Sequence, residues 1–407
     1  MDIHLWSSGY IQSAAIQVSG SKSETNRLLL LKALFPGIQI QNVSDSDDSA
    51  VMTQALYDDQ KVIDVHHAGT AMRFLTAYFA AMPGKEVVLT GSQRMKERPI
   101  KILVNALQEL GAEIEYLGAA GYPPLKIIGK EISKNKVSLA ADVSSQYITA
   151  LLLIAAKLKN GLELTLEGEI TSVPYINMTL GLLNEVGIDA VMNDNHIIVK
   201  PAHEPITKTV TIESDWSSAS YFYSIIALTP AGTKIELSSY KQNSLQGDSA
   251  LVQIYSQLGI ETVFKSDSII LQKQKEAVRS LILDLNNTPD IAQTIAVTCF
   301  GLGIDCHLTG LHTLKIKETD RLVALKNELV KLGATVNVTH DNLTLKSSGK
   351  INTDIFIETY NDHRMAMAFA PLAVKTPLII KDAGVVSKSY PAFWDDIAKL
   401  GIQLKTL

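Results

Sequence analysis

Five leucine-rich helical stretches of this 407-residue chain end in a glycine that leads directly into strand-forming residues. Glycine readily takes the left-handed conformation that ends a helix, so each glycine marks a helix C-terminus followed by a strand. The glycines are spaced by 76, 72, 74 and 68 residues, and they are Gly111, Gly187, Gly259, Gly333 and Gly401. This spacing predicts repeated α+β units. A sixth, degenerate unit is expected over residues 21–66, with its helix from Ala50 to Tyr57.

The length of these units and of the chain indicates two domains. The repeats of a thin solenoid run to about 20–45 residues, which is shorter than the units seen here. A chain of 407 residues also exceeds the size at which one core keeps growing. Two domains of three units each are therefore expected, with the change of domain near residues 211–215, before a helix from Ser217 to Leu228.

Composition excludes several classes of protein. The net charge of −5 argues against a nucleic-acid-binding protein, which normally carries a basic excess. Cys299 and Cys306 lie in an apolar stretch without metal-ligand spacing, which fits a reducing compartment and no disulfide framework. The N-terminus lacks the features of a signal peptide, and no apolar run approaches the roughly 20 residues of a membrane span. A cytoplasmic protein without membrane attachment is expected.

Arginine is used sparingly and unevenly. Only seven of the 37 basic residues are arginine, and six of these lie in five short polar segments. They are Arg27, Arg73, Arg94, Arg98, Arg321 and Arg364. The guanidinium group is planar and always charged, and it grips phosphate or carboxylate through two bonds, which lysine cannot do. The distribution predicts a small, highly anionic substrate.

Several polar segments precede apolar helical runs, as helix N-termini do. Ser21 to Glu24 forms a capping box, and the free amides of such an N-terminus favour phosphate. On local evidence a plain helix start is the better interpretation, and only Lys22, Ser23 and Arg27 favour a ligand site there. Similar segments are 142–147, 171–175, 69–70 and 361–362. Repeated units that orient their helices alike would aim these N-termini at one anionic ligand.

Candidate proton-transfer groups are ambiguous on local sequence. Asp290, after a proline, looks like a helix cap. Glu318 lies in a dense charge cluster, for which a surface salt-bridge network and a functional site are equally good interpretations. His363 fits either a structural histidine or a substrate ligand. The adjacent His66 and His67 are not expected to bind metal, and the sequence contains no Walker loop, dinucleotide fingerprint or zinc-protease motif.

Together these segments resemble the enolpyruvyl transferase family, in the branch that acts on shikimate 3-phosphate. The resemblance runs in the family's order from residue 20 to beyond residue 388, and so covers essentially the whole chain. Its motifs are Gly20-Ser21-Lys22-Ser23 with Asn26-Arg27, Ala68-Gly69-Thr70-Ala71-Met72-Arg73, Arg94-Met95-Lys96-Glu97-Arg98-Pro99-Ile100, Val143-Ser144-Ser145-Gln146, Pro289-Asp290, Lys317-Glu318-Thr319-Asp320-Arg321 and Asn361-Asp362-His363-Arg364-Met365-Ala366.

The resemblance implies an α/β fold of two inside-out α/β barrel domains, each built from three repeated βαβαββ-type units, with a cleft between them. The first strand, from Ile11 to Val18, would then pair with the C-terminal half. We expect one domain of residues 1–20 plus 215–407, carrying the acid and base and most phosphoenolpyruvate-binding residues. Residues 21–214 would form the other, carrying most residues that bind shikimate 3-phosphate.

The resemblance also implies the reaction. The family transfers the enolpyruvyl group of phosphoenolpyruvate to the 5-hydroxyl of shikimate 3-phosphate and releases phosphate. This step of the shikimate pathway leads to chorismate and the aromatic amino acids. The resemblance implies no cofactor and no metal, a monomer, and no partner beyond the two small-molecule substrates.

The family's functional residues carry over position by position. Shikimate 3-phosphate would be bound by Lys22, Ser23, Arg27, Ser144, Ser145, Gln146, Ser172, Tyr175, Asp290 and Lys317. Phosphoenolpyruvate would be bound by Lys22, Gly69, Thr70, Arg98, Gln146, Arg321, Arg364 and Lys388. The catalytic residues would be Asp290, Glu318, Lys22 and Lys317.

The chemistry explains these residue types. Asp290 would deprotonate the attacking hydroxyl, and Glu318 would protonate the methylene carbon to give a tetrahedral intermediate. Glu318 or a partner would take the proton back, and the sequence leaves open which, because such groups titrate together. Lysines and arginines would neutralise two anionic substrates that repel each other, and domain closure would exclude water.

The sequence departs from the common family pattern at His67, Phe74 and Thr313, where asparagine, proline and asparagine are frequent. These positions are expected near the phosphoenolpyruvate pocket, so His67 and Phe74 are expected to alter inhibition by glyphosate without changing the reaction.

Two rival interpretations are less favoured. The sister enzyme that acts on a UDP-amino sugar carries a reactive cysteine in a mobile loop, where residues 91–99 of this chain have none. A catalytically dead anion-binding protein would lack Asp290, Lys317 or Glu318, and all three are present.

Overall fold

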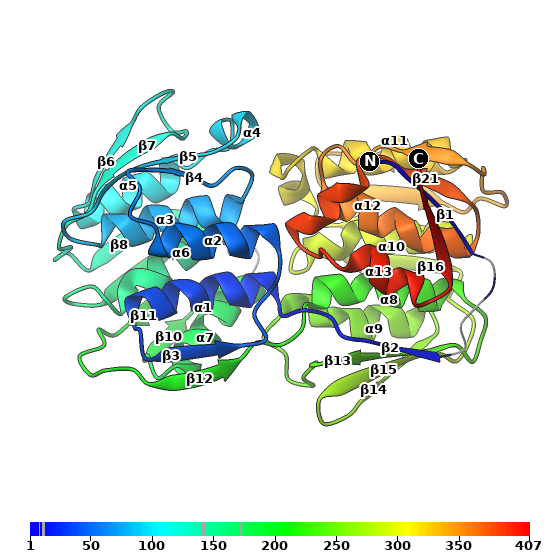
Figure 1. Cartoon of the computed structure of the whole chain (residues 1–407), viewed down its shortest axis with the longest axis horizontal. Helices are drawn as coiled ribbons and strands as arrows, with labels where there is room; N and C mark the ends of the chain where they lie inside the picture. Colours follow the sequence, from blue (N-terminus) through cyan, green and yellow to red (C-terminus); the bar gives the residue numbers. More distant parts are fainter. Residues whose placement is uncertain (8, 10–12, 141–143, 169, 171–172) are drawn as a thin grey trace. The chain divides into compact units, whose positions relative to one another are not determined.

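The computed structural model describes residues 1–7, 9, 13–140, 144–168, 170 and 173–407. The chain forms two compact units (Figure 1). Unit 1 consists of Met1–Ser19 and Glu213–Leu407, and unit 2 of Gly20–Ile212. The first boundary, after Ser19, lies one residue before the expected one, and the second, before Glu213, lies two residues before the expected one. Within the described residues, no helix combines the length and the apolar character needed to cross a membrane.

Among its described residues, unit 2 contains two four-stranded sheets with the same topology. The first repeat comprises β4 (Val62–Asp64), α3 (Gly69–Ala80), β5 (Glu86–Thr90), α4 (Gln93–Lys96), α5 (Lys101–Leu110), β6 (Glu113–Tyr116) and β7 (Leu125–Ile128). The second comprises β8 (Lys136–Ala140), α6 (Ser145–Ala155), β9 (Leu162–Glu167), α7 (Val173–Glu185), β10 (Ala190–Asn193) and β11 (His196–Val199). The strand orders are β4-β5-β7-β6 and β8-β9-β11-β10, in which the first pair is parallel and the others antiparallel. This is the expected βαβαββ unit.

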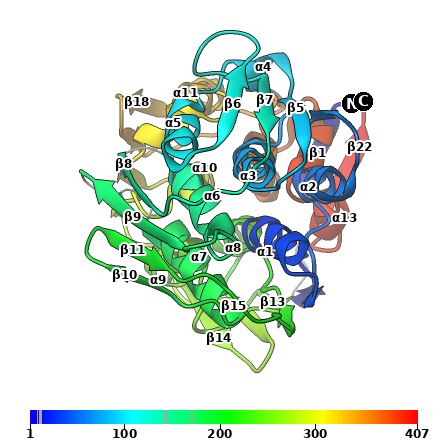
Figure 2. The ribbon, with the colours of Figure 1, turned by 90° about the vertical axis from the view of Figure 1, so that its left-hand side faces the viewer.

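The third repeat of unit 2 is reduced. It comprises α1 (Lys22–Leu34), β3 (Ile38–Gln41) and α2 (Asp47–Tyr57), with β12 (Lys208–Thr211) paired parallel to β3. Figure 2 shows α3 and α6 lying between the sheet of β5 and β7 and the sheet of β9 and β11. Helices α3 and α6 bury nearly every side chain. The sheets therefore form the outside and the helices the core, which is the reverse of an ordinary α/β barrel.

The described part of unit 1 contains three four-stranded sheets of the same kind. The first repeat is made of β2 (Ser13–Ile16), α8 (Trp216–Leu228), β13 (Lys234–Ser238), the 3-10 helix η1 (Gly247–Ala250), α9 (Leu251–Gln257), β14 (Ile260–Phe264) and β15 (Ser268–Lys273). The second is made of β16 (Ser280–Asp284), η2 (Pro289–Ile291), α10 (Ala292–Leu302), β17 (Asp305–Thr309), η3 (His312–Ile316), α11 (Arg321–Lys331), β18 (Thr335–Val338) and β19 (Leu343–Lys346). The third is made of β20 (Ile355–Ile357), α12 (His363–Phe369), η4 (Ala370–Val374), β21 (Leu378–Ile380), η5 (Ala383–Lys388), α13 (Phe393–Ala398), β22 (Ile402–Thr406) and β1 (Ile3–Ser7).

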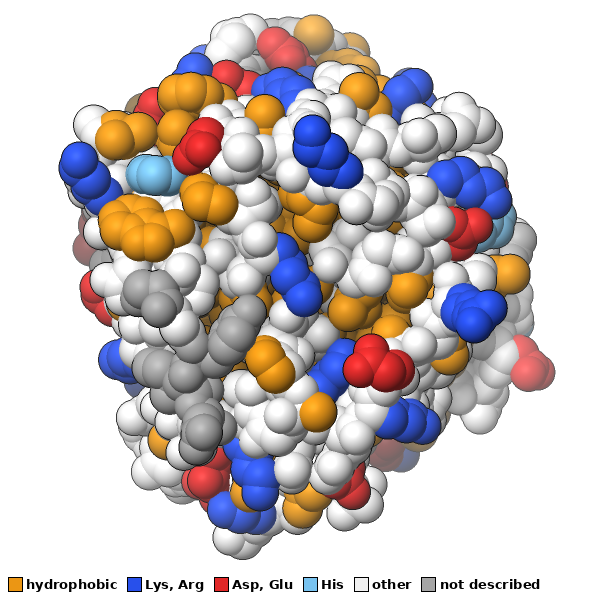
Figure 3. Space-filling model, turned by 90° about the vertical axis from the view of Figure 1, so that its right-hand side faces the viewer, with side chains coloured by type: hydrophobic (Ala, Val, Ile, Leu, Met, Phe, Trp, Pro, Cys, Tyr) orange, Lys and Arg blue, Asp and Glu red, His pale blue; other side chains and the backbone are white. Residues whose placement is uncertain are grey.

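The chain ends complete two sheets of unit 1. Strand β1 pairs with both β21 and β22, so the N-terminal strand closes the last repeat. Strand β2 pairs parallel to β13, with Ile16 opposite Leu237. The expected strand from Ile11 to Val18 corresponds in its described part to β2, whose expected pairing with the C-terminal half is confirmed, but it is not the first strand, because β1 precedes it. The face of the molecule in Figure 3 carries basic and acidic side chains interspersed with one another.

The five repeat glycines adopt the expected conformation. Their φ angles are 111°, 94°, 87°, 102° and 84° for Gly111, Gly187, Gly259, Gly333 and Gly401. Each follows a helix by one to three residues and precedes a strand, so the repeat predicted from them is confirmed.

Candidate active site

Arg27 is the centre of a buried polar group in unit 2. Its Nε donates to the Thr179 hydroxyl (2.9 Å), and Nη1 donates to the Ser23 carbonyl oxygen (2.8 Å). Nη2 donates to the Thr149 hydroxyl and the Tyr175 carbonyl oxygen, each at 3.4 Å. Burial lowers the pKa of Arg27 to about 10, partly opposed by Tyr175 and Glu24. Within the described residues, these contacts use four of its five N–H groups and leave one on Nη1.

Phe74 lies beneath this arginine. Its fully buried ring centre is 5.7 Å from the guanidinium carbon of Arg27. The sequence placed Phe74 near the phosphoenolpyruvate pocket, whereas its ring contacts the group predicted to hold shikimate 3-phosphate. Because Phe74 is inside α3, proline there would remove a helical hydrogen bond. The predicted effect of the departures on glyphosate inhibition is therefore better checked with His67→Asn alone.

The helix starts of unit 2 bring other predicted residues together. Ser144 caps α6 by accepting from the Gln146 amide, and Gln146 Nε2 donates to the Thr70 hydroxyl at 3.2 Å. A Cβ added at Gly69 would lie 2.6 Å from Nη1 of Arg98, so this guanidinium lies directly against the first residue of α3. Of the five predicted phosphoenolpyruvate ligands of this unit, the two pairs Gly69–Arg98 and Thr70–Gln146 are thus in contact at the start of α3, and Lys22 lies at the start of α1.

The other predicted residues of unit 2 that the structure describes also lie at helix starts. Lys22 and Ser23 open α1, where Ser21 accepts from the Glu24 amide as the capping box predicts. Ser145 is the first residue of α6, and half-buried Tyr175 lies in the first turn of α7. Ser172 lies outside the described residues.

A carboxylate that the sequence did not single out pairs with Lys22. Asp48 Oδ2 is 3.3 Å from Lys22 Nζ, and Asp48 Oδ1 is 3.8 Å from His67 Nε2. The neighbouring histidine has a carboxylate partner of its own: His66 Nδ1 lies 3.8 Å from Asp64 Oδ1. Within the described residues, no group of three or more potential ligands is arranged to hold a metal ion. The only local signal for Asp48 is its place just after the cap residue Ser46.

In unit 1, Arg321 joins three carboxylates. Nε donates to Asp362 at 2.6 Å, Nη1 to Asp290 at 3.0 Å, and Nη2 to Glu318 at 2.8 Å. Burial alone would lower the pKa of Arg321, but the carboxylates of Asp362, Glu318 and Asp290 together raise it above the ordinary value. The predicted catalytic acid and base, Glu318 and Asp290, are therefore held by one arginine. Together with Asp362 they accept hydrogen bonds from all three nitrogens of the Arg321 guanidinium.

Asp290 is the meeting point of the unit 1 cations. Its Oδ2 is 3.2 Å from Arg364 Nη2, and its Oδ1 is 3.7 Å from Lys317 Nζ. The local interpretation of Asp290 as a helix cap is wrong, because it lies inside η2 and caps no helix. Its carboxylate is drawn instead to the cations. Lys388 Nζ donates to both the carbonyl and the side-chain oxygen of Asn361, at 2.6 and 2.8 Å.

Asp248 extends this cluster and was not found from the sequence. It accepts a short hydrogen bond from Ser217, whose hydroxyl oxygen accepts from Arg364 Nη2 at 3.4 Å. Burial, with the nearby charge of Asp290, raises the pKa of Asp248 to about 7. Asp248 lies in none of the sequence motifs described above, so the local sequence does not mark it as a site residue.

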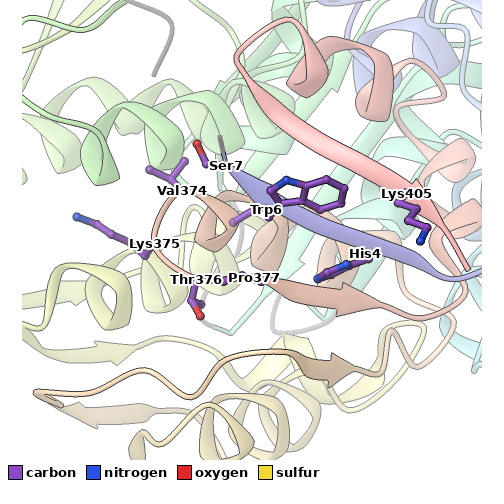
Figure 4. Close-up of a pocket in the computed structure, with 9 residues that line it drawn as sticks. His4, Trp6, Ser7, Val374, Lys375, Thr376, Pro377 and Lys405 are labelled. Carbon is purple, nitrogen blue, oxygen red and sulfur yellow. The ribbon is translucent and has the colours of Figure 1, made fainter. Parts of the chain in front are cut away.

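A separate pocket of about 600 Å³ lies in unit 1. Figure 4 shows His4, Trp6 and Lys405 along one side and Lys375 at the other end. None of its nine described lining residues was predicted as a site residue, so this pocket is distinct from the charged cluster around Asp290.

Sequence relatives identify the family. Residues 56–397 match the family model of EPSP synthase (3-phosphoshikimate 1-carboxyvinyltransferase). A 3-phosphoshikimate 1-carboxyvinyltransferase of Bacteroides fragilis is 48% identical over 398 residues, with 96% of each chain covered. One of Vibrio atlanticus is 36% identical over 420 residues, covering 96% of this chain and 97% of the relative.

Solved structures identify the fold. An EPSP synthase from Acinetobacter baumannii matches all of both chains with a TM-score of 0.80 at 20% identity. The enolpyruvyl transferase NikO from Streptomyces tendae matches with a TM-score of 0.76 at 12% identity, covering 99% of this chain and 98% of the other. The architecture is thus the α/β fold of the enolpyruvyl transferases, as expected. With its sequence relatives, the chain belongs to the EPSP synthase family and is a transferase.

Proposed function

We propose that the two clusters carry out the family's reaction in this chain. The enzyme transfers the enolpyruvyl group of phosphoenolpyruvate to the 5-hydroxyl of shikimate 3-phosphate and releases phosphate. Both substrates are anions, and the two clusters consist mainly of cationic and carboxylate side chains. The single observation that carries the assignment of roles is the guanidinium of Arg321, which holds Asp290 and Glu318 at 3.0 and 2.8 Å.

Asp290 and Glu318 are the acid–base pair. Asp290 accepts the proton of the attacking hydroxyl, and its contacts with Arg321, Arg364 and Lys317 fix its direction. Glu318 delivers a proton to the methylene carbon during addition. Because one guanidinium binds both carboxylates, protonation of either changes the electrostatic stabilisation of the other. We therefore expect the pair to titrate together, with neither apparent pKa belonging to one residue.

Unit 2 supplies the shikimate 3-phosphate site. The remaining N–H of Arg27, the hydroxyls of Ser144 and Ser145 and the first turns of α1, α6 and α7 provide donors for a phosphate. Arg27 is held rigidly by its four other bonds, so it loses little entropy on binding.

Phosphoenolpyruvate binds the remaining cations. In unit 2 these cations are Lys22 and Arg98, together with the uncharged ligands Gly69, Thr70 and Gln146. In unit 1 they are Arg321, Arg364 and Lys388. Arg98 is half-buried, and its Nε has no partner among the described residues. A guanidinium with unused donors is suited to a phosphate or carboxylate of the substrate.

The test is phosphate release from purified protein with phosphoenolpyruvate, with and without shikimate 3-phosphate. Release should require both substrates and fall by at least about 100-fold in Asp290→Asn. Asp354→Asn is the matched control, because it removes an exposed carboxylate of the same unit and asparagine tolerates the φ of 56° there. Release in the absence of shikimate 3-phosphate, or full activity of Asp290→Asn, would contradict the proposal.

The family expectation of a cytoplasmic monomer is a further part of the proposal. Sedimentation at micromolar concentration should give the mass of one 44.3 kDa chain with and without both substrates. A stable dimer would contradict it.

A further inference from the structure

Three ionisable side chains from three helix starts of unit 2 form one group, the Lys22–Asp48–His67 group. Lys22 is the first residue of α1, Asp48 lies in the first turn of α2, and His67 lies two residues before α3. The two oxygens of Asp48 face different cations, Lys22 Nζ at 3.3 Å and His67 Nε2 at 3.8 Å. A single carboxylate therefore bridges a permanent cation and a histidine.

Asp48 is well placed to couple the two cations. Its side chain is only 10% exposed, so its interactions are poorly screened by solvent. It lies next to the helix start that Ser46 caps, where the helix dipole favours a negative charge. Lys22 is also mostly buried, with its side chain 19% exposed. The geometry of the carboxylate is thus fixed by α2, whatever the charge of the imidazole.

We propose that His67 is a positioning residue that sets, through Asp48, how much of the Lys22 charge reaches an anionic substrate. With a neutral imidazole the group carries no net charge, because Asp48 neutralises Lys22. With a protonated imidazole the group carries one positive charge, and Asp48 is shared between two cations. The ammonium of Lys22 then attracts a phosphate or carboxylate more strongly. The inference rests on the proposed function, because it takes Lys22 as a substrate ligand.

Other charged groups lie on the elements that adjoin the Lys22–Asp48–His67 group. On the same segment, His66 Nδ1 lies 3.8 Å from Asp64 and is exposed. From α3 and the loop after α4, Arg73 donates to the Gly69 carbonyl and Arg98 lies against the same glycine. Arginines keep their charge at all ordinary pH values, and carboxylates titrate near pH 4. Histidine is the side-chain type whose ordinary pKa lies between pH 5.5 and 8.5.

Kinetics across this pH range test the inference. The KM for phosphoenolpyruvate is measured with saturating shikimate 3-phosphate in wild type, His67→Asn and His66→Asn. Titration of the substrates affects all three proteins alike, so it cancels in the ratio of variant to wild-type KM. We expect the His67→Asn ratio to be near one at pH 8.5 and to rise roughly threefold to tenfold by pH 5.5.

His66→Asn is the matched control. It removes an adjacent histidine whose carboxylate neighbour is Asp64, and asparagine tolerates the φ of 48° at this position. Its KM ratio should stay flat with pH. A merely structural role of His67 would shift the ratio equally at every pH, so a flat His67→Asn ratio overturns the inference. Absence of turnover in the wild type would instead overturn the proposed function.

The part of Asp48 is tested by NMR titration of the His67 ring. Removing the anionic partner in Asp48→Asn should move the midpoint of His67 to lower pH, because a carboxylate favours the imidazolium form. By linkage, phosphoenolpyruvate should move the wild-type midpoint to higher pH, because it binds the protonated form more tightly. A midpoint that is unchanged in Asp48→Asn removes Asp48 from the mechanism and overturns the proposal.

Discussion

The close approach of Arg98 to Gly69 predicts a selective loss of phosphoenolpyruvate affinity in Gly69→Ala. The added Cβ would lie 2.6 Å from Nη1 and 2.9 Å from Cζ of Arg98, where about 3.4 Å is the shortest comfortable distance. The guanidinium must therefore move by roughly 1 Å. Displacing a charge-assisted bond of about 1.5–3 kcal/mol raises KM by roughly tenfold to 100-fold. Alanine is a better helix former than glycine, so the free energy of unfolding should not fall.

The assay is a double-mutant cycle on KM and on the free energy of unfolding in urea. Gly349→Ala is the control, because an added Cβ meets nothing there. If the effect acts through Arg98, Gly69→Ala should change KM little in an Arg98→Ala background. An equal rise of KM in both backgrounds, or unchanged KM in the single variant, would refute the reasoning.

Three further predictions concern buried side chains, each checked by urea denaturation and, for Phe74, by shikimate 3-phosphate binding as well. Folding raises the pKa of Asp248 from 3.8 to about 7, so its contribution to stability is present below pH 3.8 and is lost as the pH rises to about 7. Asp248→Asn should therefore gain stability relative to wild type over this range, by at most about 4 kcal/mol, and a pH-independent difference would contradict this. Thr179→Val should lower the free energy of unfolding by about 2 kcal/mol, because it leaves an N–H of Arg27 unpaired. Thr53→Val is the control: it loses only a bond to a helix carbonyl oxygen and should lower the free energy of unfolding by less than about 1 kcal/mol. Phe74→Leu should cost about 1–3 kcal/mol and weaken shikimate 3-phosphate binding, and an unchanged binding constant would separate Phe74 from Arg27.

The repeat could be predicted from the sequence because its signals are local. A glycine that ends a helix needs only its own backbone conformation, and Gly111 and Gly333 show it in both units. The helix caps at Ser21 and Ser144 are local in the same sense, because donor and acceptor are two or three residues apart. Such features can be found without knowledge of the tertiary structure.

The ionic partners could not be predicted in this way. Arg321 meets Asp290 and Asp362, which lie 31 and 41 residues away along the chain. The partner of Lys22 was missed for the same reason, because Asp48 comes from another helix. Asp290 was misjudged locally because a carboxylate after proline resembles a cap, whereas its surroundings of three cations come from tertiary structure. Sequence motifs locate such residues but do not say which carboxylate holds which cation.

The inside-out arrangement explains why the functional residues concentrate at helix starts. A helix that runs through the core of its unit must be largely apolar beyond its first residues, as α6 is after Gln146 and α12 is after Arg364. Its first turn is the part whose amides lack intrahelical partners, so donors and charges placed there are satisfied by a ligand without disturbing the core. Lys22, Gly69 and Ser145 open helices of unit 2, and Arg321 opens α11 of unit 1. Repetition of one βαβαββ unit therefore multiplies anion-binding helix starts, and the chemistry of this family needs several of them because both of its substrates are anions.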